Sequence, residues 1–267
     1  MKNEVKEYYN ENFIGEWDRL INPYSAIEFK SNMYLIDKYF PKSGKVCDIG
    51  AGPGRYSIEL LKKGYNVTLF ELSDNELRLA EEKIKDLGLK ADALICENAL
   101  NLHLLKSESY DAILLMGPMY HLLKAEDRGR VLKESYRILK KDGVAIIAYI
   151  NSWGVLKAGV TEFSEEFNDI QDVYNYLGTQ SFTPGTSFTN LYMSTPSSAL
   201  EEVKAAGFKV ISYAGVEGFL AGIELRINQL AKENKNIYDN FVKVAAETCE
   251  LPQYRDSTEH LHIVVRK

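Results

Sequence analysis

The sequence predicts an α/β protein with a parallel β-sheet whose two faces are covered by helices. Short apolar segments alternate with amphipathic segments between residues 45 and 150, which is the order of βαβ units. The apolar segments are nearly continuous, as expected for strands that are buried on both faces. A chain of 267 residues, 45% of them hydrophobic, is long enough for one domain with insertions.

The first elements follow from hydrophobic periodicity. Residues 4–40 are expected to be helical, because aromatic and aliphatic residues recur there at steps of three and four. Ser73 and Glu76 form an expected capping box at the start of a helix that ends at Gly88. Two further helices are expected at 55–64 and 124–140. The expected strands of this half are 45–50, 66–72, 91–96, 110–117 and 143–150.

The C-terminal half is less regular. Residues 152–195 contain many aromatic side chains among polar ones and are interpreted as an insertion that covers a substrate, since such connections commonly carry specificity. Thr195 and Pro196 begin a helix that ends before Gly207. Residues 219–249 contain two helical patterns, and strands are expected at 208–214 and 261–266.

The composition excludes several classes of partner. The formal net charge is −6 and no cluster of Lys and Arg occurs, so a nucleic-acid partner is disfavoured. Neither a secretory signal nor an apolar run of about 20 residues is found. The three cysteines are too scattered for a disulfide framework or a zinc site. We expect a cytoplasmic protein without a membrane or metal partner.

A glycine-rich turn follows the first strand. Gly50, Gly52 and Gly54 occupy alternate positions in the segment DIGAGPG, and Glu71 ends the next strand 17 residues after Gly54. Glycines let the backbone turn sharply and approach a ligand, and ligands bind beyond the carboxyl ends of such strands. A carboxylate at this spacing can accept hydrogen bonds from two ribose hydroxyls. The pattern therefore predicts a nucleoside-bearing cofactor, the alternative being a tight turn beside a surface acid.

The glycine spacing differs from the G-x-G-x-x-G fingerprint of dinucleotide-binding proteins. DIGAGPG followed by Glu71 resembles motif I and the second-strand acid of the class I S-adenosylmethionine-dependent methyltransferases. The segments ENAL, YDAILLMGPMYHL and RVLKESYRILKKDGVAIIAYI extend the resemblance over roughly residues 40–150. It implies a Rossmann-like sheet of seven strands, the last antiparallel, with S-adenosyl-L-methionine as cofactor.

The resemblance also implies a set of cofactor-binding residues. Asn98 stands where the family usually has Asp, which puts the affinity for adenine in doubt. Asp48 is expected to orient the glycine turn or to reach the cofactor ammonium through water. The other implied positions are Gly50, Gly52 and Gly54 at the methionine and ribose, Glu71 at the ribose hydroxyls, Asn98, Ala99 and Leu72 at the adenine, and Met116 and Gly117 near the sulfur.

The N-terminal segment EYYNENFIGEWDRL resembles the lid of small-molecule methyltransferases of this class. Arg19 is expected to pair with the cofactor carboxylate, the alternative being an ordinary surface arginine, and Tyr9 could cover the cofactor. The expected organisation is a single methyltransferase domain. Its parts are a helical lid (1–40), a cofactor-binding core (41–151), the insertion (152–195) and a C-terminal part (196–267) with a helical connection at 216–258.

The expected chemistry needs few groups. A sulfonium is already a good leaving group, so alignment and exclusion of water suffice, unless the acceptor must lose a proton to a base. His121 and its neighbour Tyr120 follow the fourth strand and are the candidates for that base, although His121 could equally be a packing residue.

The expected acceptor is a small molecule, and the chain is expected to be a monomer or a homodimer. No tetrapeptide like NPPY or DPPY follows the fourth strand, as it would in amino-methylating nucleic-acid enzymes. Three alternatives remain: an RNA or protein methyltransferase, a nicotinamide-dependent (NAD) oxidoreductase, and a cofactor-binding module without catalysis.

Overall fold

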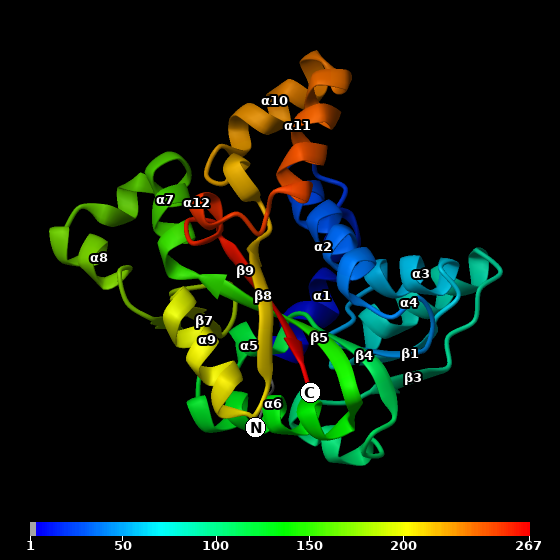
Figure 1. Cartoon of the computed structure of the whole chain (residues 1–267). Helices are drawn as coiled ribbons and strands as arrows, with labels where there is room; N and C mark the ends of the chain where they lie inside the picture. Colours follow the sequence, from blue (N-terminus) through cyan, green and yellow to red (C-terminus); the bar gives the residue numbers. More distant parts are fainter. Residues whose placement is uncertain (1–3) are drawn as a thin grey trace.

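A mixed β-sheet forms the centre of the protein (Figure 1). The computed structural model describes residues 4–267. All seven strands expected from the sequence are found, and two short strands are added to them. The strands are β1 (Lys45–Ile49), β2 (Asn66–Glu71), β3 (Ala93–Cys96), β4 (Tyr110–Leu115), β5 (Leu139–Asn151), β6 (Gln180–Phe182), β7 (Leu191–Ser194), β8 (Lys209–Gly215) and β9 (His260–Arg266).

The strand order confirms the predicted topology. The strands pair in the order β3-β2-β1-β4-β5-β9-β8, with β9 antiparallel to both of its neighbours. The added hairpin of β6 and β7 joins the carboxyl end of β5, where Ile150 pairs with both Met193 and His260. β9 pairs with one edge of β5. β7 therefore pairs with the opposite edge, at residues of β5 that lie beyond those paired with β4. The hairpin therefore lies beyond the carboxyl end of β4.

Helices cover both faces of the sheet, as the sequence predicts. Alternate residues of the strands enter two separate apolar clusters, one on each face. The helices α2 (Ser25–Tyr39), α3 (Arg55–Lys62) and α4 (Asp74–Asp86) contribute to the first cluster. The second cluster includes side chains of η1 (Ala99–Leu104), α6 (Ala125–Ile138) and α9 (Pro196–Ala205).

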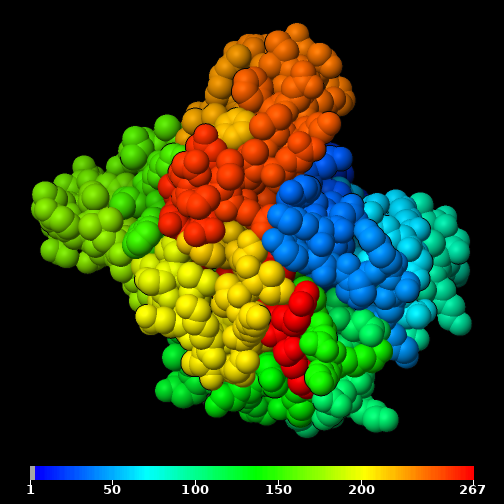
Figure 2. Space-filling view, viewed as in Figure 1, coloured from blue at the N-terminus to red at the C-terminus, as the bar shows by residue number. Residues whose placement is uncertain are grey.

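The remaining helices lie at the edges of the sheet or extend from it. The segment with α7 (Ser152–Glu162), η2 (Ser164–Phe167) and α8 (Ile170–Asn175) projects on one side, and α10 (Glu224–Glu233) projects with α11 (Lys235–Glu247) at the top (Figures 1 and 2). Within residues 4–267, no helix has the length and apolar character needed to cross a membrane. The 16-residue helix α1 (Glu4–Arg19) precedes α2 in the chain, and the short elements are α5 (Pro118–His121), η3 (Gly218–Leu220) and α12 (Pro252–Arg255).

The sequence predicts capping hydrogen bonds at the starts of α9 and α4, and the structure confirms one of them fully and the other in part. Thr195 caps α9 with a reciprocal pair of hydrogen bonds to Ser198, and Pro196 is the first helical residue. Ser73 accepts the backbone N–H of Glu76, as expected. The predicted return bond from Glu76 is wrong, because the backbone N–H of Ser73 donates instead to Glu71 Oε1 at 2.8 Å. The carboxyl group of Glu76 is thereby left to face the functional cavity.

Candidate active site

A cavity of about 420 Å³ lies at the carboxyl ends of the parallel strands. Its walls come from the turns after β1, β2, β3 and β4, from α1 and α2, and from the amino end of β9. Because β9 runs antiparallel to β5, its first residues lie at the same edge as the last residues of β5. The cavity therefore occupies the place in an open α/β sheet where ligands bind.

The three glycines after β1 have different surroundings. All three have positive φ: 76° at Gly50, 53° at Gly52 and 80° at Gly54. A Cβ on Gly50 would lie 2.4 Å from the carbonyl oxygen of Met116, and one on Gly54 would lie 3.0 Å from Cβ of Ala80. On Gly52 a Cβ would meet nothing closer than Oε2 of Glu76 at 3.8 Å. Gly50 and Gly52 line the cavity, whereas Gly54 is absent from its wall and permits close packing on α4.

Glu71 is buried, and both of its carboxylate oxygens are fixed. Oε2 accepts the backbone N–H of Gly52 and Oε1 accepts that of Ser73, each at 2.8 Å. Each oxygen keeps a lone pair that can accept a further hydrogen bond. Glu76 lies beside Glu71, and burial together with the Glu71 carboxylate raises the pKa of Glu76 well above its usual range. Burial raises the pKa of Glu71 as well, while the backbone N–H groups of Ser73 and Gly52 oppose that rise.

Asp48 lies behind the glycine turn and does not line the cavity. Its Oδ2 accepts a hydrogen bond from Oγ of Ser57 at 2.7 Å, while its buried Oδ1 has no partner within the described chain. Burial raises the pKa of Asp48 to about 7. The contact ties the end of β1 to the first turn of α3, which agrees with the expected role in orienting the turn.

The residues expected around the adenine and the sulfur lie in the cavity wall. Asn98 begins η1, where its Oδ1 accepts the backbone N–H of Leu100 at 2.9 Å. Its side-chain amide therefore still has N–H groups to donate. Gly117 lies at the end of β4 with φ 121°. The wall residues of this group are Leu72, Asn98, Ala99, Met116 and Gly117.

Arg19 lines the cavity at the end of α1, but it already has two carboxylate partners. Its Nη1 lies 2.9 Å from Oε2 of Glu28, and its Nε lies 3.2 Å from Oε2 of Glu16. Burial alone would raise the pKa of Glu28, but Arg19, with two nearby histidines, lowers it to about 2. Nη2 of Arg19 remains for the expected contact with a cofactor carboxylate.

His121 and Tyr120 line the cavity in α5. Nδ1 of His121 lies 2.8 Å from the carbonyl oxygen of Asn190, so this nitrogen carries the proton and donates it. Nε2 lies 2.7 Å from the hydroxyl of Tyr9 and accepts from it. Burial lowers the pKa of His121 to about 4. The imidazole therefore has a fixed neutral tautomer, and it connects α1 to the turn after β4.

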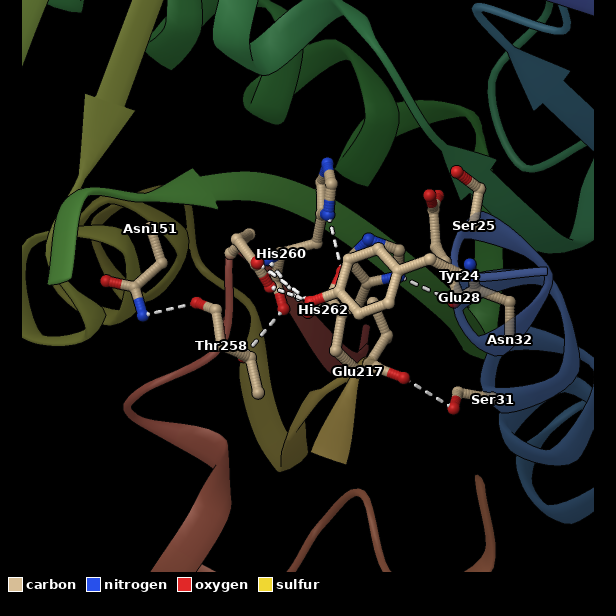
Figure 3. A network of polar contacts seen from close by, with 12 residues as sticks. Tyr24, Ser25, Glu28, Ser31, Asn32, Asn151, Glu217, Thr258, His260 and His262 are labelled. Carbon is tan, nitrogen blue, oxygen red and sulfur yellow. Dashed lines mark hydrogen bonds and ion pairs between the residues drawn. The ribbon is translucent and has the colours of Figure 1, made fainter. Parts of the chain in front are cut away.

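The sequence indicates His121 as a candidate base, but it is one of three histidines that line this cavity. His260 and His262 also line the cavity, together with Glu28 and Tyr56. Figure 3 shows a network of polar contacts around the two histidines, with side chains from α2, from β9 and from Glu217, which lies between β8 and η3. The sequence did contain a signal for these two histidines. The last strand was expected to be antiparallel, so its first residues lie at the edge of the sheet where ligands bind, and alternate residues share one face.

The network fixes each histidine in a different way. Nδ1 of His260 lies 2.6 Å from Oε1 of Glu217, a carboxylate that is itself buried. Burial alone would lower the pKa of His260, but Glu217 and Glu28 raise it to about 9. Nδ1 of His262 lies 2.5 Å from Oδ1 of Asn32, and burial lowers the pKa of His262 to about 3. His260 is thus a cation at neutral pH and His262 is neutral.

The residues present fit the cofactor that the resemblance implies. Open space in front of Gly52 would be filled by any larger side chain. Glu71 has a lone pair free on each oxygen, and Oε1 of the neighbouring Glu76 is buried without a partner within residues 4–267. These features form a polar cradle between the glycine turn and the end of β2, where a ribose with two hydroxyls can bind.

The comparisons with known proteins agree with the fold. Residues 46–143 match the family model described as a methyltransferase domain. The glycine/sarcosine N-methyltransferase of Parasynechococcus marenigrum is 29% identical over 160 residues, which cover 58% of this chain and 55% of that protein. The enzyme of the same name from Aphanothece halophytica is 29% identical over 154 residues, covering 57% of each. The chain thus spans about half the length of the curated relatives it matches.

Solved structures of methyltransferases are similar to this chain in fold. The 1,6-didemethyltoxoflavin-N1-methyltransferase of Burkholderia thailandensis, solved with S-adenosylhomocysteine, covers 99% of this chain and 87% of its own, with a TM-score of 0.61 and 15% identity. An S-adenosylmethionine-dependent methyltransferase of Methanosarcina mazei covers 87% and 96%, with a TM-score of 0.58 and 20% identity. The strand order, the glycine turn with its carboxylate and the family model that matches residues 46–143 together make this chain similar to S-adenosylmethionine-dependent methyltransferases.

Proposed function

We propose that this protein transfers a methyl group from S-adenosyl-L-methionine to a small molecule, and that an amine nitrogen is the acceptor. The two curated relatives named above are N-methyltransferases of glycine and sarcosine. The toxoflavin-type structural neighbour is also named for methylation at a nitrogen. These names favour a nitrogen acceptor without identifying it.

The observation that carries the proposal is the continuity of one cavity. The same cavity is lined by Glu71 at the end of β2 and by His260 and His262 on β9. The first end suits the nucleoside of the cofactor, and the second offers separate polar groups for an acceptor. Helix α1 lies over the cavity, since Tyr9 contacts His121 while Asn10 bonds to Ser73 and Asn75 in the first turn of α4.

The bound cofactor supplies an activated methyl group on a sulfonium, so this chain needs only to bind, orient and shield the reactants. Glu71 and the glycine turn hold the ribose, and the end of β4 at Met116 and Gly117 places the reacting centre. Tyr9 and Tyr120 close the cavity against water. We assign a positioning role to His121, because its Nε2 already accepts a hydrogen bond from the hydroxyl of Tyr9.

A macromolecular acceptor is less well supported. The acceptor end of the cavity lies beneath α1 and α2, and the acidic composition disfavours RNA. A nicotinamide dinucleotide is disfavoured by the glycine spacing, as the sequence already indicated. A cofactor-binding module without catalysis remains the second candidate, and an activity measurement separates it from an enzyme.

Isothermal titration calorimetry with S-adenosylmethionine, S-adenosylhomocysteine and NAD tests the cofactor. We expect both S-adenosyl compounds to bind and NAD not to bind. Release of S-adenosylhomocysteine in the presence of a panel of small amines then tests the reaction. Tight NAD binding without S-adenosyl binding would refute the proposal. Cofactor binding without turnover of any small acceptor would favour the module.

A further inference from the structure

One end of the cavity contains ionisable side chains that the cofactor contacts described above do not use. We call the space between Glu28, His260 and His262 the inner subsite. All three residues line the cavity, and the ring centroids of the two histidines are 6.5 Å apart. Glu28 and His262 are buried, and Glu28 is close enough to change the pKa of both histidines. The groups therefore share one small volume beneath α2.

His260 offers a hydrogen-bond donor to this volume. Its Nδ1 is bound to Glu217, whose other oxygen accepts the backbone N–H of His260 at 3.2 Å. Its Nε2, on the opposite edge of the ring, has no hydrogen-bond partner among residues 4–267. In the imidazolium form that Glu217 favours, Nε2 carries a proton and a share of the positive charge. This nitrogen suits a carboxylate or another anionic oxygen.

His262, in contrast, offers a hydrogen-bond acceptor to the inner subsite. Asn32 donates from Nδ2 to the hydroxyl of Tyr56 at 2.7 Å, so its Oδ1 is the acceptor for Nδ1–H of His262. With the proton fixed on Nδ1, Nε2 has a free lone pair and no partner within the described chain. Oε1 of Glu28 is likewise free among residues 4–267, because Arg19 contacts only Oε2. These two acceptors suit the N–H groups of an amine.

We propose that the inner subsite binds a methyl acceptor that carries both an amine and a carboxylate or a comparable anionic group. His260 donates from Nε2 to the anionic group, and His262 accepts an N–H of the amine, with Glu28 beside it. This inference rests on the proposed function and names the substrate class of the same cavity. In the transfer, the amine nitrogen forms the new N–C bond, the electrons of the broken S–C bond stay on sulfur, and the product ammonium loses its proton to water.

The cofactor has an amino-acid tail with the same two charges, so the test must separate the two ligands. We assign the tail to Arg19, which stands at the end of the lid, and the acceptor to the histidines of β9. Affinity for S-adenosylhomocysteine and for 5′-methylthioadenosine, which lacks the tail, is measured by calorimetry in each variant. His260→Gln should leave both affinities unchanged. Weaker S-adenosylhomocysteine binding with unchanged methylthioadenosine binding would assign the inner subsite to the cofactor and overturn the proposal.

Turnover is measured with matched pairs of amines that differ in a carboxylate: glycine and methylamine, sarcosine and dimethylamine, histidine and histamine. We expect turnover to favour the carboxylated member of at least one pair. His260→Gln should raise KM for that member roughly tenfold to hundredfold, with kcat nearly unchanged, and leave the other member unaffected. The matched control is His103→Gln, at an exposed histidine in η1 outside the cavity wall, which should behave as wild type.

The variant Glu217→Gln tests whether the charge on His260 matters. It should make KM, relative to wild type, depend on pH, which the loss of a purely structural contact would not do. It removes the carboxylate that keeps His260 charged, while Glu28, Arg19, His262 and Glu259 still face the ring. The ratio of the variant's KM to the wild-type KM for the carboxylated amine should be close to 1 at pH 6 and rise to about 10 by pH 8.5, because the titration of the amine itself affects both proteins equally. If His260→Gln fails to fold because Glu217 is left buried and unpaired, the double variant Glu217→Gln with His260→Gln replaces it.

Each outcome has a distinct meaning. Equal or better turnover of the decarboxylated amines would overturn the inference and leave the proposed methyl transfer intact. No turnover of any small acceptor, with cofactor binding preserved, would refute both. Nitrogen-15 spectra of the histidine rings give an independent check, because at pH 7 His260 should be doubly protonated and His262 protonated on Nδ1 only. A neutral His260 would also refute the inference.

Discussion

The carboxylate of Glu71 is expected to carry much of the cofactor affinity. Each of its oxygens accepts one backbone N–H at 2.8 Å, which leaves one lone pair on each for a ribose hydroxyl. A hydrogen bond to a charged group contributes about 1.5–3 kcal/mol, but water in the cavity would replace the carboxylate at the ribose hydroxyls in Glu71→Ala. We therefore expect the variant to lose about 1–3 kcal/mol of binding free energy in total, or roughly 5- to 150-fold in Kd.

The same change should also cost stability, because the backbone N–H groups of Gly52 and Ser73 lose their acceptor. Glu71 is only 5% exposed, so water has little access to the two N–H groups when the carboxylate is removed. Urea denaturation should show a loss of about 1–3 kcal/mol in the free energy of unfolding. Glu81→Ala, on the exposed face of α4, is the matched control and should change neither quantity.

Calorimetry with S-adenosylhomocysteine and 5′-methylthioadenosine decides the case. Both ligands carry the ribose, so Glu71→Ala should weaken both by a similar factor. A folded variant that binds both ligands as tightly as wild type would show that Glu71 does not hold the ribose. A loss confined to S-adenosylhomocysteine would place the carboxylate near the amino-acid tail instead.

Five further changes test other parts of the site. Gly52→Val should abolish cofactor binding in calorimetry with a modest loss of stability, whereas Gly50→Ala should mainly lower the melting temperature, because its Cβ would lie 2.4 Å from a carbonyl oxygen. Arg19→Ala should weaken S-adenosylhomocysteine but not methylthioadenosine; equal loss would contradict the tail assignment. Glu76→Gln should stabilise the fold more at pH 8 than at pH 5 in urea denaturation. The carboxyl of Glu76 stays protonated when folded but ionises above its ordinary pKa when unfolded, so wild type loses stability as pH rises. His121→Ala should raise KM and keep kcat within about tenfold; a kcat lower by about 10² with unchanged KM would make this residue the base instead.

The sequence predicted the sheet because its signals are local. Five of the seven strands (β1, β2, β4, β5 and β9) are apolar runs buried on both faces of the sheet. The edge strands β3 and β8 are only partly buried, but they too are short and apolar. The glycine turn and Glu71 are also local, since they occupy the ends of two neighbouring strands. The hairpin of β6 and β7 was missed because its strands are only three and four residues long and lie among polar residues. Its pairing depends on the free edge of β5 beyond β4, which no local pattern reports.

The role of Glu76 shows how a correct motif can mislead. The Ser73–Glu76 pair satisfies the sequence rule for a capping box, and the Ser73 half of the box is present. Glu71 competes for the same backbone N–H group and holds it, because it ends the adjacent strand just two residues before Ser73. The carboxyl group of Glu76 is then free to line the cavity beside the Glu71 carboxylate. A local rule cannot weigh a competitor from a different element.

The two histidines of β9 show where sequence reasoning stops. They have the same side chain, two residues apart on one face of one strand, yet one is charged and the other neutral. The difference comes from their partners: Glu217 lies 43 positions from His260, and Asn32 lies 230 positions from His262. A carboxylate favours the imidazolium, whereas an amide oxygen fixes one neutral tautomer without supplying charge. The fold thus makes a donor and an acceptor from one residue type, and this pairing gives the cavity a polarity that an amine with an anionic group would match.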